Sequence, residues 1–553
     1  MDANAPQSSE DIVRELHHTL GRAPRICILS LSAIPDDPRV RRQGDAFQEI
    51  GWSVVAVGLP GWKSPSPTWP VYSWDDLERL EAGVSSRRLD KSVCSETSAA
   101  PELSARADTE TPVANSSHAA LQNEHREDTA LRDSASTGNL ASLPLLQHAR
   151  AHYHRAQANL EVPTAYKWLL RLAALTTRNA LKAKLRAYHA LRLIARRSMR
   201  INATVQRMMH LRAIAQRDVR YALLPLLFPD RGPDLYLEVS EIQRYYRVAS
   251  HIDADVYLAN DWHMLPVAMK LANERSAQFG YDTHEYALEE YKYRLRWRLT
   301  RRPMARAVEA IGLRGALVAS TVSRGIGDDM QRVYGLSRRL IDIRNVPTSR
   351  AIRFSPPGEI IEVLYHGIIV QDRGLEECIR SVPYWRQEFR FVLRGPSTPE
   401  YRAKLENLAR QLGVVHRVHF APAVPMTELV AAASASHIGI STPPKTSKHN
   451  IFALPNKFFE YIHAGLAVCV ADLPDMSQIV RQFDLGRTIK DLSPASIAAA
   501  INGFDHESIK RYRQNSCAAA KILNWEQEKQ KLTDSYSREL LRALQKSRMA
   551  SSG

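Results

Sequence analysis

Fully apolar runs alternate with amphipathic runs near the start of the chain, as expected for buried strands and the helices that cover them. Residues 26–33 (ICILSLSA) and 53–59 (SVVAVGL) are predicted to be strands, joined by a helix over residues 40–50. Strands that are apolar on both faces are typical of parallel sheets with helices on either side. The segment therefore predicts a βαβ opening.

The same pattern returns later in the chain, in two blocks. In the first block, strands are predicted at residues 253–261, 276–286, 315–323 and 340–347. In the second, strands are predicted at residues 361–367, 389–395, 417–422, 436–442 and 466–472, with helices at 375–382, 400–412, 426–433 and 457–464. Two such blocks predict an α/β chain of two Rossmann-like domains that face each other across a ligand cleft.

A long segment inside the first block departs from this pattern. Residues 85–145 are rich in Ser, Thr, Ala and charged residues, so they cannot bury enough apolar surface to fold and are predicted to be disordered. Residues 146–220 are predicted to form helices, and they hold sixteen Lys or Arg against two acidic residues. Most of the net charge of +16 therefore belongs to this one segment.

The basic helices allow three interpretations. In the first, the helices are a solvated pair without a partner. In the second, they are an amphipathic anchor on an acidic membrane surface, with Leu and Trp on one face and Lys and Arg on the other. These two interpretations stay open. A nucleic-acid arm is disfavoured because the segment carries no stacking-aromatic or recognition motif.

The domain limits follow from these patterns. We expect an N-terminal tail (1–22) and a first Rossmann-like domain on the acceptor side (23–347) that carries an insertion (85–220). A linker (348–358) leads to a second domain that binds a nucleotide sugar (359–522). A C-terminal helix (523–547) is expected to cross back to the first domain.

The sequence contains neither an apolar leader nor an apolar run long enough to cross a membrane. Its five cysteines are scattered and form no CxxC pair, which favours buried thiols in a reducing compartment. We therefore expect a cytoplasmic protein, either free or peripheral at the inner face of the membrane.

Two strand-to-helix turns in the second block can bind a phosphorylated ligand. Gly367 follows a strand, and Arg373 and Gly374 come directly before a helix; Asn456 and Lys457 begin another helix. Helix-terminal N–H groups and fixed cations suit a diphosphate. Glu460, one turn further on, suits a ribose diol, because a carboxylate accepts from both hydroxyls. The simpler interpretation is that Arg373 and Glu460 are solvated surface residues that bind no ligand.

Polar residues also follow the strands of the first block. Asp37 and Arg39 lie in the loop after the first strand, on the expected acceptor side of the cleft, where Arg39 could contact an anion. Two later strands end in a pair of acid-plus-His clusters, Asp261 with His263 and His284 with Glu285. Such clusters are candidates for chemistry, although a single His is more often structural. Their spacings match no zinc pattern, so no metal site is predicted.

Six short motifs occur in order at these strand ends. They are DPRV (37–40), ND followed by LP (260–261, 265–266), DTHE (282–285), VS with RNVP (322–323, 344–347), YHG with RG (365–367, 373–374) and LPNKFFEY (454–461). Together they resemble the family-4 glycosyltransferases of the GT-B fold, in the branch with D-x-H-E and L-P-N-K-x-x-E-Y motifs. The resemblance covers about residues 25 to 544.

The resemblance implies roles for individual residues. Arg373 and Lys457 would hold the donor diphosphate, Glu460 would bind the nucleotide ribose, and His284 would lie near the transferred sugar, within a catalytic set that includes Asp261 and Glu285. It implies no metal and no cofactor besides the nucleotide-sugar donor. One position departs from the family: eight residues before Glu460, where a glutamate is common, this chain has Phe452.

These observations predict a glycosyltransferase that moves a sugar from a nucleotide sugar to a glycan or lipid-linked acceptor in polysaccharide or glycoconjugate synthesis. Retention of anomeric configuration is expected from the resemblance alone. The alternative is a non-catalytic GT-B scaffold or membrane-bound partner protein, favoured by Phe452 and the basic insertion. A sugar-nucleotide epimerase is disfavoured because its acidic catalytic set is not recognisable.

Overall fold

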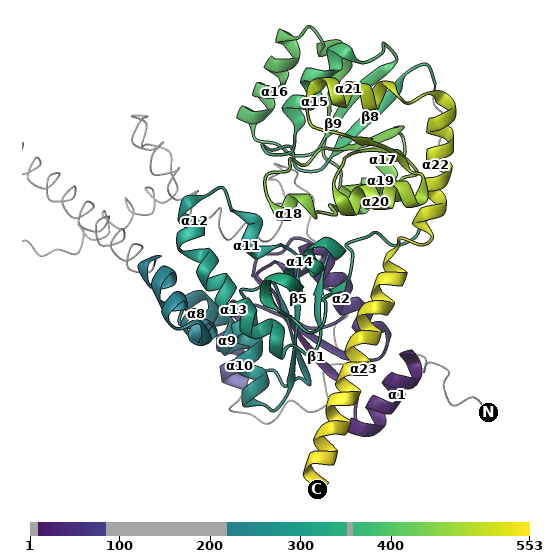
Figure 1. Ribbon diagram of the computed structural model, residues 1–553. Coiled ribbons are helices and arrows are strands. Elements are labelled where there is room, and N and C mark those ends of the chain that lie inside the picture. Colours follow the sequence, from purple (N-terminus) through teal and green to yellow (C-terminus); the bar gives the residue numbers. More distant parts are fainter. Residues whose placement is uncertain (1–8, 84–217, 351–357, 553) are drawn as a thin grey trace, which may run out of the picture. The chain divides into compact units, whose positions relative to one another are not determined.

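The computed structural model describes residues 9–83, 218–350 and 358–552, which form two separate parallel sheets with their helices (Figure 1). The fold class expected from the apolar runs, two α/β sheets in series, is confirmed. The expected disorder at residues 85–145 and nearly all of the basic helices at 146–220 lie outside the described residues, as do residues 351–357 of the linker.

The first sheet has seven strands in the order β3-β2-β1-β4-β5-β6-β7, and every pairing is parallel. The strands are β1 (Arg25–Leu29), β2 (Ser53–Val57), β3 (Val71–Tyr72), β4 (Val256–Asn260), β5 (Gln278–Thr283), β6 (Ala319–Thr321) and β7 (Ile341–Asp342). The helices are α1 (Ser9–Leu20), η1 (Ile34–Asp36), α2 (Pro38–Glu49), η2 (Trp74–Asp76), α3 (Leu77–Gly83), η4 (Pro229–Arg231), α8 (Gly232–Leu237), α9 (Ser240–Ala249), α10 (Leu265–Glu274), α11 (Ala287–Glu290), α12 (Leu295–Leu299), α13 (Arg301–Gly315) and α14 (Arg324–Tyr334).

The second sheet has six parallel strands in the order β10-β9-β8-β11-β12-β13. The strands are β8 (Ile361–His366), β9 (Phe389–Arg394), β10 (Val418–Ala421), β11 (Ile438–Ser441), β12 (Ala467–Ala471) and β13 (Gly486–Ile489). The helices are α15 (Leu375–Ser381), η5 (Val382–Tyr384), α16 (Pro399–Gln411), η6 (Val415–Arg417), η7 (Met426–Glu428), α17 (Leu429–Ala433), α18 (Lys448–Ile451), α19 (Asn456–His463), α20 (Pro474–Phe483), α21 (Pro494–Asn502), α22 (His506–Ala520) and α23 (Trp525–Ser552).

Local signals set several helix boundaries near the strand ends. Asp37 caps α2 by accepting from the backbone N–H groups of Arg39 and Val40, and Pro38 occupies the first helical position, where its missing N–H costs nothing. Ser323 caps α14 in the same way, and Gly335, with φ 62°, ends it in the left-handed conformation. Helix α14 therefore begins shortly after β6, whereas η1 lies between β1 and the start of α2.

The N-terminal tail predicted for residues 1–22 needs a correction, because α1 occupies residues 9–20. Its apolar residues Ile12, Val13 and Leu16 fall on one helical face and are buried, and the helix packs on α23. The polar composition of this stretch hid a narrow apolar stripe. The strand predicted at residues 315–323 is also shorter than expected, because α13 continues to Gly315 and β6 begins only at Ala319.

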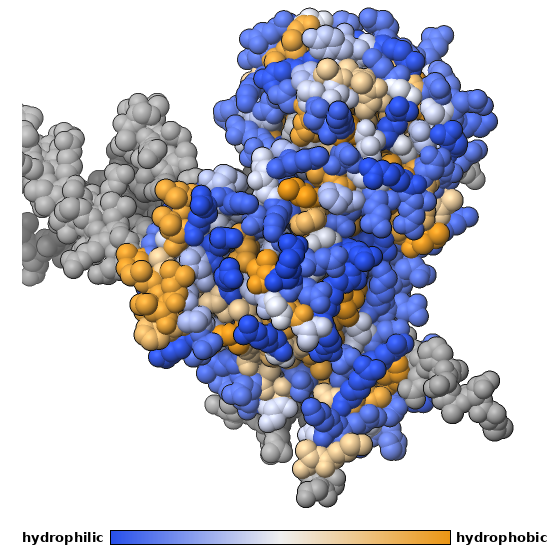
Figure 2. Space-filling model, in the orientation of Figure 1, coloured by the Kyte–Doolittle hydropathy of each residue, from blue (hydrophilic) through white to orange (hydrophobic). Residues whose placement is uncertain are grey.

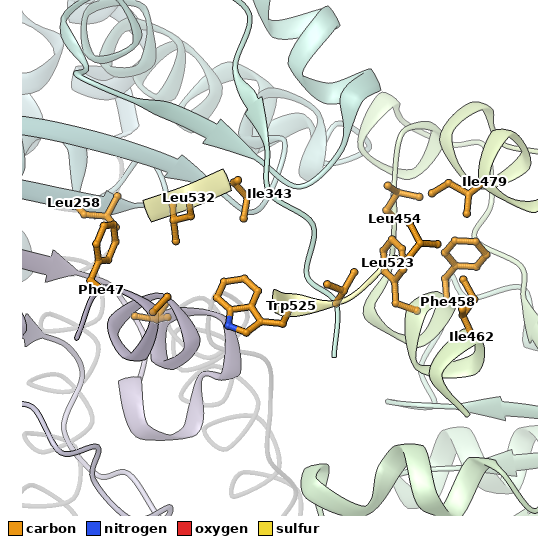
Figure 3. Close-up of a cluster of buried hydrophobic side chains, with 14 of the residues drawn as sticks. Phe47, Leu258, Ile343, Leu454, Phe458, Ile462, Ile479, Leu523, Trp525 and Leu532 are labelled. Carbon is orange, nitrogen blue, oxygen red and sulfur yellow. The ribbon is translucent and has the colours of Figure 1, made fainter. Parts of the chain in front are cut away.

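One apolar core cluster links the C-terminal segment to both sheets. Figure 3 shows part of it: Leu532 of α23 lies near Phe47 and Leu258 of the first sheet domain, while Leu523, just before α23, lies near Phe458 of the second. Burial of such side chains contributes about 1.5–3 kcal/mol each. The segment that begins near Leu523 therefore contributes to both cores.

Candidate functional site

Glycines line the ends of the strands in the second sheet. Gly367 follows β8 with φ 114°, and Gly374 precedes α15 with φ 73°, in the region that favours glycine. A Cβ on Gly374 would lie 2.5 Å from the carbonyl oxygen of Thr442, which follows β11. A Cβ on Gly395, after β9, would overlap the carbonyl of Gly367. Backbone segments thus meet closely at this edge of the sheet.

Lys457, in the first turn of α19, lies over this glycine edge. Its ammonium donates to the Tyr365 hydroxyl at 2.8 Å and lies 4.0 Å from the centre of that ring. A Cβ on Gly367 would lie 3.4 Å from the Lys457 Nζ. Burial, followed by the positive charge of Arg373, lowers the pKa of Lys457 to about 7, although Glu460 opposes the shift. Arg373 and Lys457 therefore form a cationic pair beside the starts of α15 and α19.

Glu460 lies one turn further along α19, and its Oε2 is 2.8 Å from the Nε2 of His366. The contact lacks the alignment of a hydrogen bond, since neither ring nitrogen of His366 has an aligned partner. The His366 ring packs on that of Tyr461, with centroids 4.7 Å apart. Glu460 keeps 20% of its side chain exposed, and Asn456 is exposed at the start of the helix. A half-buried carboxylate thus lies on the same helix as Lys457.

A buried carboxylate, Asp282, organises the strand ends of the first sheet. Arg39 donates to both of its oxygens at 2.8 Å, and Gln43 and Ser320 each donate at 2.6 Å. Burial opposes ionisation of Asp282, but Arg39 and then His284 outweigh it and hold its pKa well below the usual range. The fully buried charge is therefore well paired.

His284 lies directly after β5, against this carboxylate. Its Nε2 is 2.8 Å from Asp282 Oδ2 and 2.8 Å from Asn260 Oδ1, and its Nδ1 is 3.7 Å from Asp261 Oδ2. Both neighbours of Nε2 are acceptors, so this nitrogen carries a proton. Burial lowers the pKa of His284, but Asp261 and Asp282 outweigh it and raise it above the ordinary value. His284 is thus held with its Nε2–H directed at Asp282, and 17% of its side chain is exposed.

The sequence-predicted residues of the first domain divide into two groups. Asp261 joins His284: its Oδ1 accepts the His284 backbone N–H at 3.1 Å, while its own backbone has φ 62°. Glu285 contacts a residue of the other domain, with Oε2 3.2 Å from His449 Nε2. His263 does not join the cluster but stacks on Trp262, with centroids 4.1 Å apart, and burial lowers its pKa to about 3.

One expectation for the first loop is corrected. Arg39 was expected to contact an anionic ligand, but its Nε and Nη2 engage Asp282 and its Nη1 donates to the Ile343 carbonyl at 2.9 Å. Asp37, predicted to lie in the same loop, caps α2. Both side chains are buried, and both act on the arrangement of the loop and of Asp282.

Sequence reasoning missed the charged residues near Glu285. Lys448 of α18 donates to both oxygens of Asp329 at 3.0 and 2.9 Å, and its backbone N–H donates to Glu289 at 3.3 Å. The Tyr286 hydroxyl donates to Asp329 at 2.6 Å. Since Lys448 and Asp329 are 119 positions apart, no local motif could have paired them.

Phe452, at the position where the related family often has a glutamate, packs against α14. A Cβ on Gly325, the second residue of α14, would overlap its ring. The backbone N–H of Gly325 donates to both oxygens of Asp475 at 3.2 Å. Phe452 thus belongs to a packing contact with the first sheet domain.

Anion binding at Lys457 is expected to depend on pH. The pKa of about 7 in the free protein means that the ammonium form, which binds anions, is lost as pH rises through this value. The affinity for inorganic pyrophosphate is therefore expected to fall by up to about tenfold per pH unit above pH 7. Titration calorimetry from about pH 6 to about pH 8.5 measures this fall. The variant Lys457→Met is the control for titration of the ligand itself; an identical slope in both proteins would contradict the assignment.

Among the described residues, no helix is long and apolar enough to cross a membrane. Within the same described ranges, no cluster of three or more His, Cys, Asp or Glu side chains could hold a metal ion.

One protein family matches the chain. The family described as "Glycosyl transferases group 1" matches residues 361–504, which contain every strand of the second sheet together with Gly367, Arg373, Lys457 and Glu460. The match covers less than half of the chain. A comparison with curated protein sequences gave no match.

Solved structures resemble the chain over most of its length. Sucrose-phosphate synthase from Thermosynechococcus elongatus has a TM-score of 0.53 and 14% identity, and the match covers 94% of this chain and 100% of that one. A glycosyltransferase from Rickettsia africae has a TM-score of 0.49 and 8% identity, over 94% and 99% of the two chains. Anabaena HepE in complex with UDP and glucose has a TM-score of 0.45 and 15% identity, over 57% and 84%. The chain therefore has the GT-B fold, and its second sheet domain matches glycosyl transferases group 1.

Proposed function

We propose that this protein is a glycosyltransferase that moves a sugar from a nucleotide-sugar donor to an acceptor hydroxyl. The observation that carries the proposal is Lys457, a cation at the start of α19 that lies over the glycine edge of β8 with Arg373 nearby. A part-buried ammonium whose pKa has fallen to about 7 lacks a strong anionic partner, which a diphosphate would supply. The family match over the same residues supports glycosyl transfer as the reaction.

In this proposal the donor lies along the start of α19. Arg373 and Lys457 hold the diphosphate, helped by N–H groups near Gly367 and Gly374, and Glu460 accepts hydrogen bonds from the ribose hydroxyls. When the bond between the sugar and the diphosphate breaks, negative charge grows on the leaving oxygen. Cations fixed before the reaction stabilise this charge without reorganising. We propose that they do so without a metal ion.

His284, with Asp261 and Glu285, is proposed to act on the sugar and the acceptor. With its Nε2–H directed at Asp282, His284 would use Nδ1 toward a sugar hydroxyl or the departing oxygen, and this nitrogen donates a hydrogen bond when the ring is protonated. The acceptor oxygen forms the new bond to the sugar, with retention of configuration, as the bond between the sugar and the diphosphate breaks, and the acceptor's hydroxyl proton passes to the departing diphosphate oxygen. We propose a glycan or a lipid-linked acceptor in polysaccharide or glycoconjugate synthesis, and a cytoplasmic enzyme that can associate with the inner face of a membrane.

The proposal is tested by incubating the full-length protein with a panel of nucleotide sugars and following the release of nucleoside diphosphate. At least one donor should be hydrolysed slowly without an acceptor and faster with a suitable acceptor. If none is turned over and none raises the unfolding temperature, the chain is a non-catalytic scaffold, and the proposal fails.

Replacing Glu460 by alanine is expected to weaken binding of the preferred donor by about tenfold to 150-fold, because hydrogen bonds to a charged acceptor contribute about 1.5–3 kcal/mol. The effect should be much smaller for inorganic pyrophosphate, which has no ribose. Titration calorimetry with both ligands checks the difference. Glu400→Ala, at an exposed position in α16, is the control. An equal loss of affinity for both ligands would contradict the ribose role.

A further inference from the structure

Large apolar side chains stand exposed on one part of the first domain. Residues 222–227 are helical and lead into η4 and α8, and the second exposed set lies in and beside α12. The exposed fractions are Leu223 52%, Leu226 68%, Leu227 66% and Phe228 54% in the first set, and Tyr293 67%, Leu295 65% and Leu299 58% in the second. Exposed apolar groups gathered in this way mark a surface that binds a partner.

Both sets border the same helix. Helix α13 contacts η4 and α8, which follow the first set, and it also contacts α12, which carries the second. Figure 2 shows apolar patches on one face of the molecule, over the segment that leads into α8 and over α12 (compare Figure 1). The two sets therefore flank α13 on one face.

The second set is interleaved with positive charge. Residues 291–308 contain no Asp or Glu, and their cations are Lys292, Arg294, Arg296, Arg298, Arg301, Arg302 and Arg306. Lys292 and Arg302 lie 3.1 and 3.7 Å from the buried Glu289. Arg294 lies over the rings of Tyr291 and Tyr293, at 5.2 and 5.6 Å from their centres. The face therefore combines apolar side chains with an excess of cations.

We infer that this face docks on an anionic lipid bilayer. Leu226, Leu227 and Phe228 would enter the interface, while Arg294 and Arg298 would meet the lipid phosphates, since apolar burial and attraction to anionic headgroups act together on such surfaces. A second copy of this chain would bring like charges together. Docking of the basic residues 146–217 on this face would also bring like charges together. Neither of these two partners explains the excess of cations as well as an anionic bilayer does.

The inference is tested with the full-length protein and vesicles of phosphatidylcholine, alone or mixed equally with phosphatidylglycerol. The protein is expected to sediment with the mixed vesicles and much less with the neutral ones. The variant Leu226→Ser, Leu227→Ser, Phe228→Ser should bind the mixed vesicles at least about tenfold more weakly. Arg294→Glu with Arg298→Glu should weaken binding severalfold and make it less sensitive to salt.

The matched control is Ile360→Ser, Tyr384→Ser, Met426→Ser, at similarly exposed positions of the second domain, where the exposed fractions are 52%, 66% and 50%. It should bind like the unaltered protein. Every replaced residue is at least half exposed, so unfolding temperature and pyrophosphate affinity should not change in either variant. Unaltered binding of the Leu226, Leu227, Phe228 variant would assign the attachment to another segment and overturn the inference, as would equal binding to neutral vesicles or no binding at all.

Discussion

Replacing Lys457 by methionine is expected to abolish nearly all sugar transfer while the protein stays folded. Methionine keeps the length and the apolar body of the side chain but removes the ammonium that lies over Gly367. Removing one preorganised group that stabilises developing negative charge typically costs a factor of about 10²–10³ in kcat. Donor affinity should fall as well, because the same charge contacts the diphosphate before the reaction. Steady-state kinetics with the preferred donor measures both effects.

Lys490→Met is the matched control for this loss, because Lys490 is exposed and follows β13 in the same domain. It should retain full activity. Lys457→Arg should recover part of the activity, since the charge is restored with a different shape. Activity within about twofold of the unaltered enzyme in Lys457→Met would remove the basis of the proposed mechanism.

Separating Asp282 from Arg39 is expected to cause the largest loss of stability. Asp282 is fully buried, and only 4% of the Arg39 side chain is exposed. Removing one member of a buried, hydrogen-bonded ion pair leaves the other charge without compensation, which costs about 3–5 kcal/mol. Arg39→Met and Asp282→Asn should each lower the free energy of unfolding by an amount of this order, measured by urea denaturation.

The double variant distinguishes pairing from general damage. If the two groups interact as the structure indicates, Arg39→Met with Asp282→Asn should cost about 1–3 kcal/mol less than the sum of the two single variants. The exposed pair Arg402–Glu406, at 2.9 Å, is the control, since Arg402→Met should cost less than about 1 kcal/mol. Strict additivity at Arg39 and Asp282 would contradict the proposed coupling.

Asp282→Asn also has a consequence for His284. The pKa of His284 is raised because Asp261 and Asp282 together outweigh burial, so loss of the Asp282 charge should lower it. The proton-donating form would then be lost at lower pH, and the alkaline limb of the rate profile should shift to lower pH. A profile unchanged by this substitution would argue that His284 does not titrate during the reaction.

The general fold could be predicted because buried parallel strands leave a strong pattern. Runs such as residues 361–367 and 466–472 are apolar on both faces, and each forms a strand of the second sheet. The two-residue strand β3 left no such pattern. Its position depends on its pairing with β2 rather than on its own sequence.

Only part of the candidate site could be predicted. Gly367, Gly374, Arg373 and Lys457 were recognisable because glycines and cations beside helix starts have a local physical meaning. The role of Arg39 could not be recognised in the sequence, because its partner Asp282 is 243 positions away. The two meet only because β4 lies between β1 and β5 in the sheet, an order that no local pattern determines. His263 and His284 likewise look equivalent in sequence, and burial against Trp262 separates them.

A diphosphate site at the start of α19 is central to the proposed function. Its most direct test is titration calorimetry of the full-length protein with nucleosides, nucleoside monophosphates and nucleoside diphosphates of several bases. One diphosphate should bind at least about tenfold more tightly than its monophosphate, and this difference should vanish in Lys457→Met. If no diphosphate binds more tightly than its monophosphate, or if the difference persists without the ammonium, Lys457 does not hold a diphosphate.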